Sequence, residues 1–327
     1  MTLHYAFVCP HFVFHVGDRL LTTGGAGNAT SWDAYSNKTI LVHAKNGIAA
    51  ISYAGLAHIR NTPTDQWLVE KMLPGWTPTI FPSGRGGPST EINGHHNLTL
   101  GGMCKDVIAG IETEFLAEPK ASREHTLSVM ISGWTWKRRA RYGATRARSY
   151  HRKIVHLGHA DEACKVSRSP LVLHHLEPSS TYVFDPLGMA GDLPYLEQSF
   201  AHLFAKGDPV GPDDIEELLV DAIRHASSGP RGDVIGTECM SVFIPFYGYP
   251  RLRFIRDVAL PETRTAFMPW FVSENLVSPP LVVTGSTPNF ALGDGPDALH
   301  IINDCKPPLP KSSRSSFGGQ PRKRPGN

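Results

Sequence analysis

Residues 2–19 read TLHYAFVCPHFVFHVGDR, and residues 37–55 read NKTILVHAKNGIAAISYAG. Both runs are rich in aromatic and β-branched residues, which favour strands. The first run is interrupted at Cys9-Pro10-His11 and the second at Asn46-Gly47, a typical hairpin turn. The sequence therefore predicts that the fold opens with two β-hairpins, whose strands lie at 3–9, 11–16, 39–45 and 48–54.

A threonine directly follows the initiator methionine. Removal of Met1 would leave a hydroxyl and a free α-amine on Thr2. A hydroxyl is a weak nucleophile unless a base takes its proton, and an α-amine with a pKa of about 7.7–8.0 suits that task at neutral pH. Thr2 would then carry both the nucleophile and its base.

Two charged residues in the same runs are candidates to support this nucleophile. Asp18 follows the second predicted strand, and Lys38 comes directly before the third. An ammonium group favours the developing negative charge on a hydroxyl oxygen, and a carboxylate can hold that ammonium in place. Lys38 would supply the cation and Asp18 would orient it.

These residues resemble the N-terminal region of the proteasome-type N-terminal nucleophile (Ntn) hydrolases. In that family an acidic residue follows the catalytic threonine by sixteen positions, and a strand-opening lysine and an Ala-Gly pair come later. Here Asp18 follows Thr2 by sixteen positions, Lys38 opens an apolar strand, and Ala54-Gly55 ends the next strand. The resemblance implies Thr2 as nucleophile, Asp18 and Lys38 as its electrostatic support, and Gly55 as the oxyanion donor.

The resemblance spans about residues 1–256 and implies an α+β fold. This fold is a four-layer αββα sandwich of two antiparallel sheets flanked by helices, and the order of the predicted elements agrees with it. After the two hairpins the patterns predict helices at 63–73 and 100–117, a strand at 127–136, short strands at 170–176 and 181–185, helices at 193–205 and 212–227, and strands at 239–246 and 251–255.

Further site candidates come from the resemblance. In the family a Ser-Gly or Gly-Gly ends the strand comparable to 127–136, near the N-terminal residue, which makes Ser132 a candidate; a bulge at Ser132-Gly133 is the preferred interpretation. The family also carries Asp-x-x-Ser-Gly after its later helix, where it orients the terminal amine. Ser228 matches this motif, but His225 stands at the aspartate position. Asp221 and Asp233 are alternative carboxylates for that role.

Other segments differ in composition from the predicted domain. An insertion at 76–97 is rich in Pro and Gly, and 137–153 reads as a basic loop without helical or strand periodicity. Cations beside aromatics suit polyanions, so the basic loop keeps nucleic acid as a minor alternative, but a solvated loop is preferred. Residues 257–305 form a strand-containing extension. Residues 306–327 hold six Lys/Arg and no acid, a composition typical of a disordered tail.

Composition narrows the class of protein. The 327 residues are 41% hydrophobic, enough for a large core, and the net charge of +2 indicates no preference for nucleic acid or a membrane. No apolar run is long enough to span a membrane, and residues 1–16 lack the features of a signal peptide, so a cytoplasmic location is predicted. The five cysteines and 16 histidines show no metal-ligand spacing. We expect no metal and no cofactor.

The sequence thus predicts a hydrolase of peptide or amide bonds, a threonine peptidase or amidase. Its partner is a peptide or amide substrate. Family members build rings or dimers, so a homo-oligomer is left open. The alternative is a catalytically inactive Ntn-fold subunit that serves assembly or binding, which His225 at the aspartate position and the long C-terminus favour.

Overall fold

A computed structural model provides the structure of the chain. It describes residues 2–23, 30–33, 36–74, 90–91, 98–115, 127–136, 147–156, 166–168, 182–188, 193–205, 210–230, 232–255, 265–267, 269–273, 276–278, 280, 282–284, 289–292 and 299–304.

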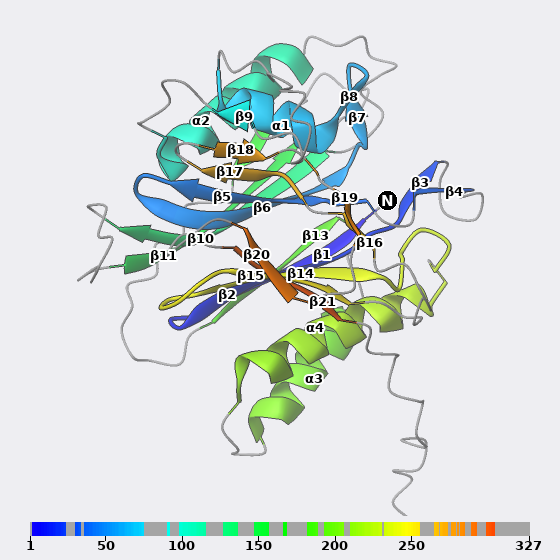
Figure 1. Cartoon of the computed structure of the whole chain (residues 1–327). Helices are drawn as coiled ribbons and strands as arrows, with labels where there is room; N and C mark the ends of the chain where they lie inside the picture. The colour runs from blue at the N-terminus through cyan, green and yellow to red at the C-terminus, as the bar shows by residue number, and fades with distance from the viewer. Residues whose placement is uncertain are drawn as a thin grey trace, which may run out of the picture.

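One large sheet is built around the first hairpin. In it, β1 (Leu3–Val8) pairs antiparallel with β2 (Phe12–Asp18), as the sequence predicts. The described strands of this sheet run in the order β13 (Val183–Gly188), β1, β2, β14 (Cys239–Pro245), β15 (Arg251–Ile255), β21 (Leu299–Asp304) and β20 (Asn289–Leu292). β1 is therefore an interior strand, which fixes the start of the chain (Figure 1).

The second hairpin lies in the other large sheet. β5 (Thr39–Ala44) and β6 (Gly47–Gly55) turn at Asn46-Gly47, again as predicted. The described strands of this sheet run in the order β12 (Val166–Arg168), β11 (Ala147–His156), β10 (Leu127–Trp136), β6, β5, β17 (Phe271–Ser273), β18 (Leu276–Ser278) and β9 (Thr90–Glu91).

The two sheets pack face to face. Val13 and Val242 of the first sheet share a buried apolar cluster with Leu41 and Ala50 of the second. The indole Nε1 of Trp134 also donates a hydrogen bond across the interface to the Ile244 carbonyl, at 3.1 Å. The inner faces of both sheets are thus removed from water.

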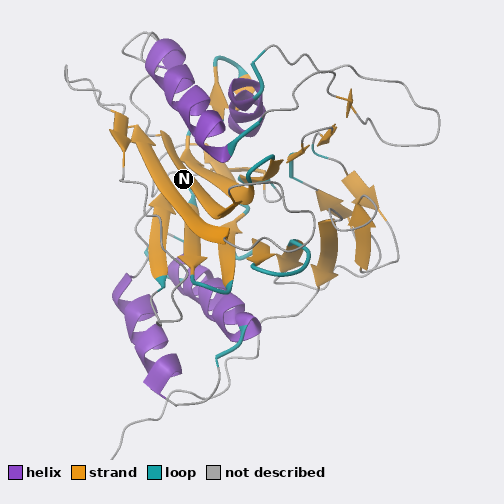
Figure 2. Cartoon of the chain, turned by 90° about the vertical axis from the view of Figure 1, so that its left-hand side faces the viewer, coloured by secondary structure: helices purple, strands orange, loops and turns teal. Residues whose placement is uncertain are grey.

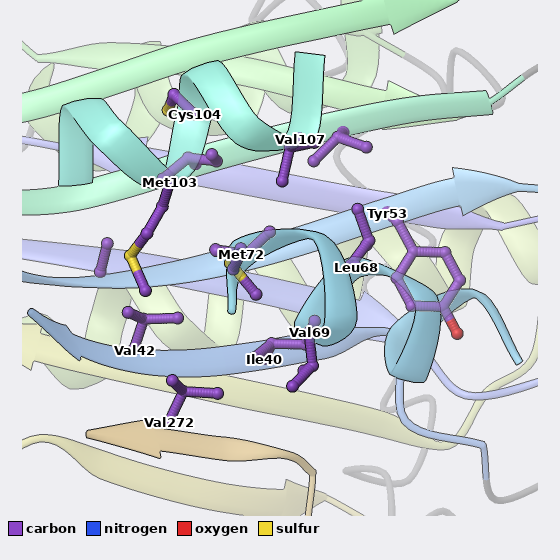
Figure 3. Close-up of a cluster of buried hydrophobic side chains, with 14 of the residues drawn as sticks. Ile40, Val42, Tyr53, Leu68, Val69, Met72, Met103, Cys104, Val107 and Val272 are labelled. Atoms are coloured by element: carbon purple, nitrogen blue, oxygen red, sulfur yellow. The ribbon is translucent and has the colours of Figure 1, made fainter. Parts of the chain in front are cut away.

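A helix pair covers the outer face of each sheet (Figures 1 and 2). α1 (Thr64–Met72) and α2 (Leu100–Gly110) pack on the second sheet, and Figure 3 shows side chains of both helices against those of β5 and β17. α3 (Leu193–Ala205) and α4 (Pro212–Ser227) pack on the first sheet. The predicted α+β class is confirmed by this mixture of helices and largely antiparallel sheets.

Shorter elements lie around this frame. They are the hairpins β3 (Leu21–Thr23) with β4 (Thr30–Asp33), β7 (His58–Ile59) with β8 (Thr62–Pro63) and β16 (Thr265–Phe267) with β19 (Val282–Thr284), and a π-helical turn, Ile111–Phe115, at the end of α2. The hairpin of β3 and β4 thus lies in the chain between the first two hairpins.

One expectation about the sheets needs correction. The sheets are not purely antiparallel, because β21 pairs parallel to β15 and β17 pairs parallel to β5. These strands come from the 257–305 extension, so part of the extension joins both sheets; the predicted domain boundary at 256 stays a prediction. The predicted strand at 170–176, residues 305–327 and most of the 76–97 insertion lie outside the described residues.

The predicted basic loop at 137–153 is wrong from Ala147 onward. Residues 147–156 form β11, which pairs residue by residue with β10. Backbone groups of a buried strand must find partners, and β11 supplies them to β10. Tyr150, at the centre of β11, is buried, and its hydroxyl lies 2.8 Å from Cys104 Sγ of α2. The many charged residues of this run hid its strand character from the sequence pattern.

Candidate active site

Thr2 lies at the start of β1, buried at the end of the sheets from which β3 projects (Figure 1). Thr2 is only 4% exposed, and the strand that it precedes has neighbours on both sides, β13 and β2. The backbone N–H of Leu3, the next residue, donates a 2.7 Å hydrogen bond to Oδ1 of Asp18. The start of the chain is thus tied to the end of β2.

Asp18 is a buried anchor for several groups at once. Its Oδ2 accepts hydrogen bonds from the Lys38 ammonium at 3.1 Å, the Leu20 N–H at 3.1 Å and the Gly236 N–H at 3.2 Å. With Leu3 on Oδ1, the carboxylate receives four donors and is fully enclosed. Such charge-assisted bonds offset the cost of taking the carboxylate out of water.

Lys38 precedes β5, and its side chain is also buried. Besides Asp18, the ammonium donates a 2.6 Å hydrogen bond to the Leu20 carbonyl. The backbone carbonyl of Lys38 accepts a 3.0 Å hydrogen bond from the Tyr53 N–H on β6. Asp18 therefore binds the Thr2–Leu3 peptide with one oxygen and a buried ammonium with the other.

The end of β6 lies beside Thr2. A Cβ placed on Gly188 of β13 would be 2.0 Å from the Thr2 carbonyl oxygen and 3.0 Å from Ala54 Cβ, so the Thr2 backbone and the Ala54 side chain both lie against Gly188. Gly55 follows, exposed and with a φ of +104°, a conformation that glycine adopts readily. The structure thus brings together Thr2, Asp18, Lys38 and the Ala54-Gly55 turn.

Gly188 is the residue that allows this approach, which gives a first prediction. Gly188→Ala should lower the free energy of unfolding by about 2–4 kcal/mol, because its φ is +89° and the new methyl group would meet the Thr2 backbone. Urea unfolding measures the effect. Gly101→Ala is the control: it lies on exposed α2 surface with nothing within 4 Å of the new methyl group, and should stabilise slightly. Equal midpoints for both variants would contradict the close packing at Thr2.

Three further site candidates lie on the last turns of α4 or directly after it. Ser228 caps the C-terminal end of α4 and is exposed, with its hydroxyl donating to the Arg224 carbonyl at 2.9 Å. His225 is exposed and stacks on Tyr195 of α3 at a ring distance of 4.1 Å. Asp221 is exposed one turn earlier. Contact with Asp18 comes instead from Gly236, beyond the turn that follows α4.

Ser132 is buried in the middle of β10, opposite Ala50. The residue of β10 that lies opposite Ala54 is Ser128. Four residues of an antiparallel strand separate the two serines, roughly 13 Å. The structure therefore places Ser132 well inside the sheet rather than at the end near Thr2.

Sequence reasoning missed His4, which is fully buried on β1. Burial holds the pKa of its imidazole well below the usual value, and the charges of Lys38 and His15 lower the pKa further. The ring is therefore neutral at physiological pH. The available signal was its spacing, since residues two apart on a strand share a face and His4 is two residues from Thr2.

A second buried histidine continues the polar line between the sheets. His15 Nδ1 lies 2.7 Å from Ser52 Oγ, which lies 2.9 Å from Thr39 Oγ1. Thr39 is the residue after Lys38. The polar atoms around the candidate site are thus linked from β2 through β6 to β5.

Among the described residues, no group of three or more His, Cys, Asp or Glu side chains is arranged to hold a metal ion. Within the same residues, none of the helices combines the length and apolar character needed to cross a membrane. No protein-family model matches the chain, and no curated protein matches it.

Proposed function

We propose that the protein is an N-terminal nucleophile hydrolase that cleaves peptide or amide bonds with Thr2 after removal of Met1. One observation carries the proposal: the buried Asp18 carboxylate binds the Leu3 N–H with one oxygen and the Lys38 ammonium with the other. This contact holds a cation next to the first residues of the chain. A cation there is what a threonine hydroxyl needs to become a nucleophile.

The proposed reaction uses Thr2, Lys38 and Gly55. The Thr2 hydroxyl gives its proton to the Thr2 α-amine while its oxygen attacks the substrate carbonyl, and Lys38 stabilises the charge on that oxygen. The Gly55 N–H stabilises the tetrahedral oxyanion. The proton then passes to the leaving amine, which departs and leaves an acyl ester on Thr2. Water hydrolyses the ester, releasing the acid and regenerating the hydroxyl.

The packing supports the finer part of the fold proposal. Two facing sheets, each with a helix pair on its outer side, support the proposed assignment to the four-layer αββα sandwich of the Ntn hydrolases. The parallel strands β17 and β21 would be additions to this frame. β1 in the interior of one sheet is the placement that such a nucleophile requires.

A second function is favoured by one specific observation. Ser228, the residue expected to orient the terminal amine, is exposed and bonded to its own helix. Without an orienting group the chain would serve assembly or binding as an inactive Ntn-fold subunit. In that case the chain should not react with a probe directed at an N-terminal threonine, whether or not Met1 is removed.

The mass of the intact protein tests the proposal. The purified chain is expected to lack Met1, and incubation with a peptide epoxyketone should add one probe molecule. This probe reacts with a hydroxyl and an amine on adjacent carbons, which an N-terminal threonine provides. Retention of Met1 would remove the free amine and contradict the catalytic proposal in favour of the binding one.

A further inference from the structure

The buried imidazole of His4 has no part in the mechanism above. We propose that His4 is a positioning residue of the Thr2 site: its uncharged ring supports the Lys38 ammonium and stabilises the second positive charge that forms on the Thr2 α-amine. This inference rests on the proposed function. It assigns a role to a residue that neither the Thr2 chemistry nor the packing of the core requires.

His4 faces the same side of β1 as Thr2. Leu3, Tyr5 and Phe7 pack into the core beneath α3 and α4, whereas Ala6 and Val8 pack toward the second sheet. Side chains alternate along a strand, so His4 also points toward the second sheet, as does Thr2 two residues earlier. His4 is therefore the next side chain inward from the proposed nucleophile.

The ring is held against the end of β2. Gly17 lies directly opposite His4 in the sheet register. A Cβ on Gly17 would be 1.8 Å from His4 Nδ1 and 1.9 Å from Cε1, so the imidazole occupies the space a side chain would need there. The charge of Lys38 acts on the ring, so the imidazole also lies near the Asp18–Lys38 ion pair.

The surroundings of the ring keep it neutral but polar. The charged and titratable groups that act on it are Lys38, from the start of β5, and His15 from β2; Lys38 is itself paired with Asp18, and Asp185 lies on the neighbouring strand β13, opposite Ala6. Among the described residues, neither ring nitrogen has a hydrogen-bond partner. A buried polar group without a partner costs stability, which an apolar residue would avoid. A neutral imidazole does keep one acceptor nitrogen, and this can serve a positive charge.

Such a charge forms during the proposed attack. When the Thr2 hydroxyl gives its proton to the α-amine, a second cation arises near Lys38. Two like charges close together in a low-dielectric interior repel each other strongly. An uncharged acceptor beside them offsets this repulsion, and a protonated histidine would add to it.

The test compares the rate of epoxyketone labelling across pH for His4 variants. In His4→Phe and His4→Leu the maximal second-order rate should fall about tenfold or more, as for the loss of one hydrogen bond to a charged group. On the acidic side of the pH profile, the pH of half-maximal labelling rate should also fall. Without the His4 acceptor the α-ammonium is less stable and gives up its proton more easily. His4→Gln keeps an uncharged acceptor and should restore part of both.

Tyr5→Phe is the matched control, because it removes a polar atom from the adjacent buried ring on the opposite face of β1. It should keep the wild-type profile. If the apolar His4 variants keep the wild-type rate and midpoint while Thr2 is labelled, His4 only fills space and the inference is overturned, with the proposed function intact. If wild type is not labelled at any pH, the proposed function fails and the role of His4 with it.

Stability supplies a readout that needs no activity. The unfolded chain binds a proton at His4 near pH 6.5, whereas the folded chain does not. The contribution of His4 to stability is thus complete above about pH 6.5 and is lost as the pH falls below it. The urea midpoint of wild type should fall more steeply toward pH 5 than that of His4→Phe. Equal slopes would show that His4 is not a buried neutral group and would overturn the inference.

Discussion

Thr2→Ala is expected to abolish epoxyketone labelling and any amide hydrolysis, with a loss of at least about 10³-fold, as for the removal of other catalytic nucleophiles. The variant keeps the α-amine, the Asp18–Lys38 ion pair and the Leu3 hydrogen bond, because none of these depends on the hydroxyl. Only the attacking oxygen is removed. The measurement is the pseudo-first-order rate of mass gain at a fixed probe concentration.

Thr2→Ser is the control for this result. Serine supplies a hydroxyl and an α-amine at the same position, so labelling should persist, although at a lower rate because serine lacks the methyl group that restricts χ1. Both variants should unfold at urea concentrations close to that of wild type. Labelling of Thr2→Ala at the wild-type rate would show that the probe reacts elsewhere and would remove Thr2 as the nucleophile.

Asp18→Asn should be the most destabilising single change near the site. The Asp18 side chain is fully buried and receives four donors, one of which is the Lys38 ammonium. An amide cannot neutralise Lys38, and its NH₂ group would face other donors. Breaking one partner of a buried ion pair typically costs about 3–5 kcal/mol, whatever the net value of the intact pair. Urea unfolding should show this loss, and labelling of Thr2 should fall with it.

Asp213→Asn provides the comparison. Asp213 also pairs with a cation, Arg251 at 3.2 Å, but its side chain is 80% exposed. Exposed ion pairs contribute roughly 0–1 kcal/mol, so this variant should unfold almost as wild type does. A destabilisation of Asp18→Asn no larger than that of Asp213→Asn would mean that Asp18 does not organise the start of the chain.

The sequence predicted best the elements whose signals are local. The Asn46-Gly47 turn defined the second hairpin, and the apolar face of 212–227 with its acidic start defined α4. Long-range pairing carried no such signal. Nothing in residues 299–304 or 271–273 alone indicates that these strands pair parallel to β15 and β5. Strand pairing depends on contacts between segments far apart in the chain, so the residue pattern of one segment does not identify its partner.

The candidate site likewise combines residues that a sequence pattern indicates with residues that it does not. The sequence predicted that Asp18 orients Lys38, and the structure shows this ion pair, with Asp18 also accepting from the Leu3 N–H; the roles of Thr2 and Gly55 stay predictions. Gly188 and Gly236 could not be found in this way. Each matters through its backbone, by close approach to Thr2 or by an N–H donated to Asp18, and glycine at such a position looks like any other loop glycine.

The residues carried over by motif alone fared differently. Ser228 matches the residue types of a family motif, yet it lies exposed at the C-terminal end of α4. Ser132 lies inside β10. A short motif fixes residue types but not the direction in which the chain presents them. His4 illustrates the reverse, since it belongs to no motif but shares a strand face with Thr2.

Fragmentation of the labelled protein tests the central claim most directly, because it identifies the atoms that carry the probe. We predict that the adduct lies on the N-terminal peptide beginning with Thr2, and that it is joined to both the α-nitrogen and the hydroxyl oxygen of that residue. An adduct on any other residue, or an N-terminal peptide that begins with Met1 and carries no probe, would contradict Thr2 as the nucleophile.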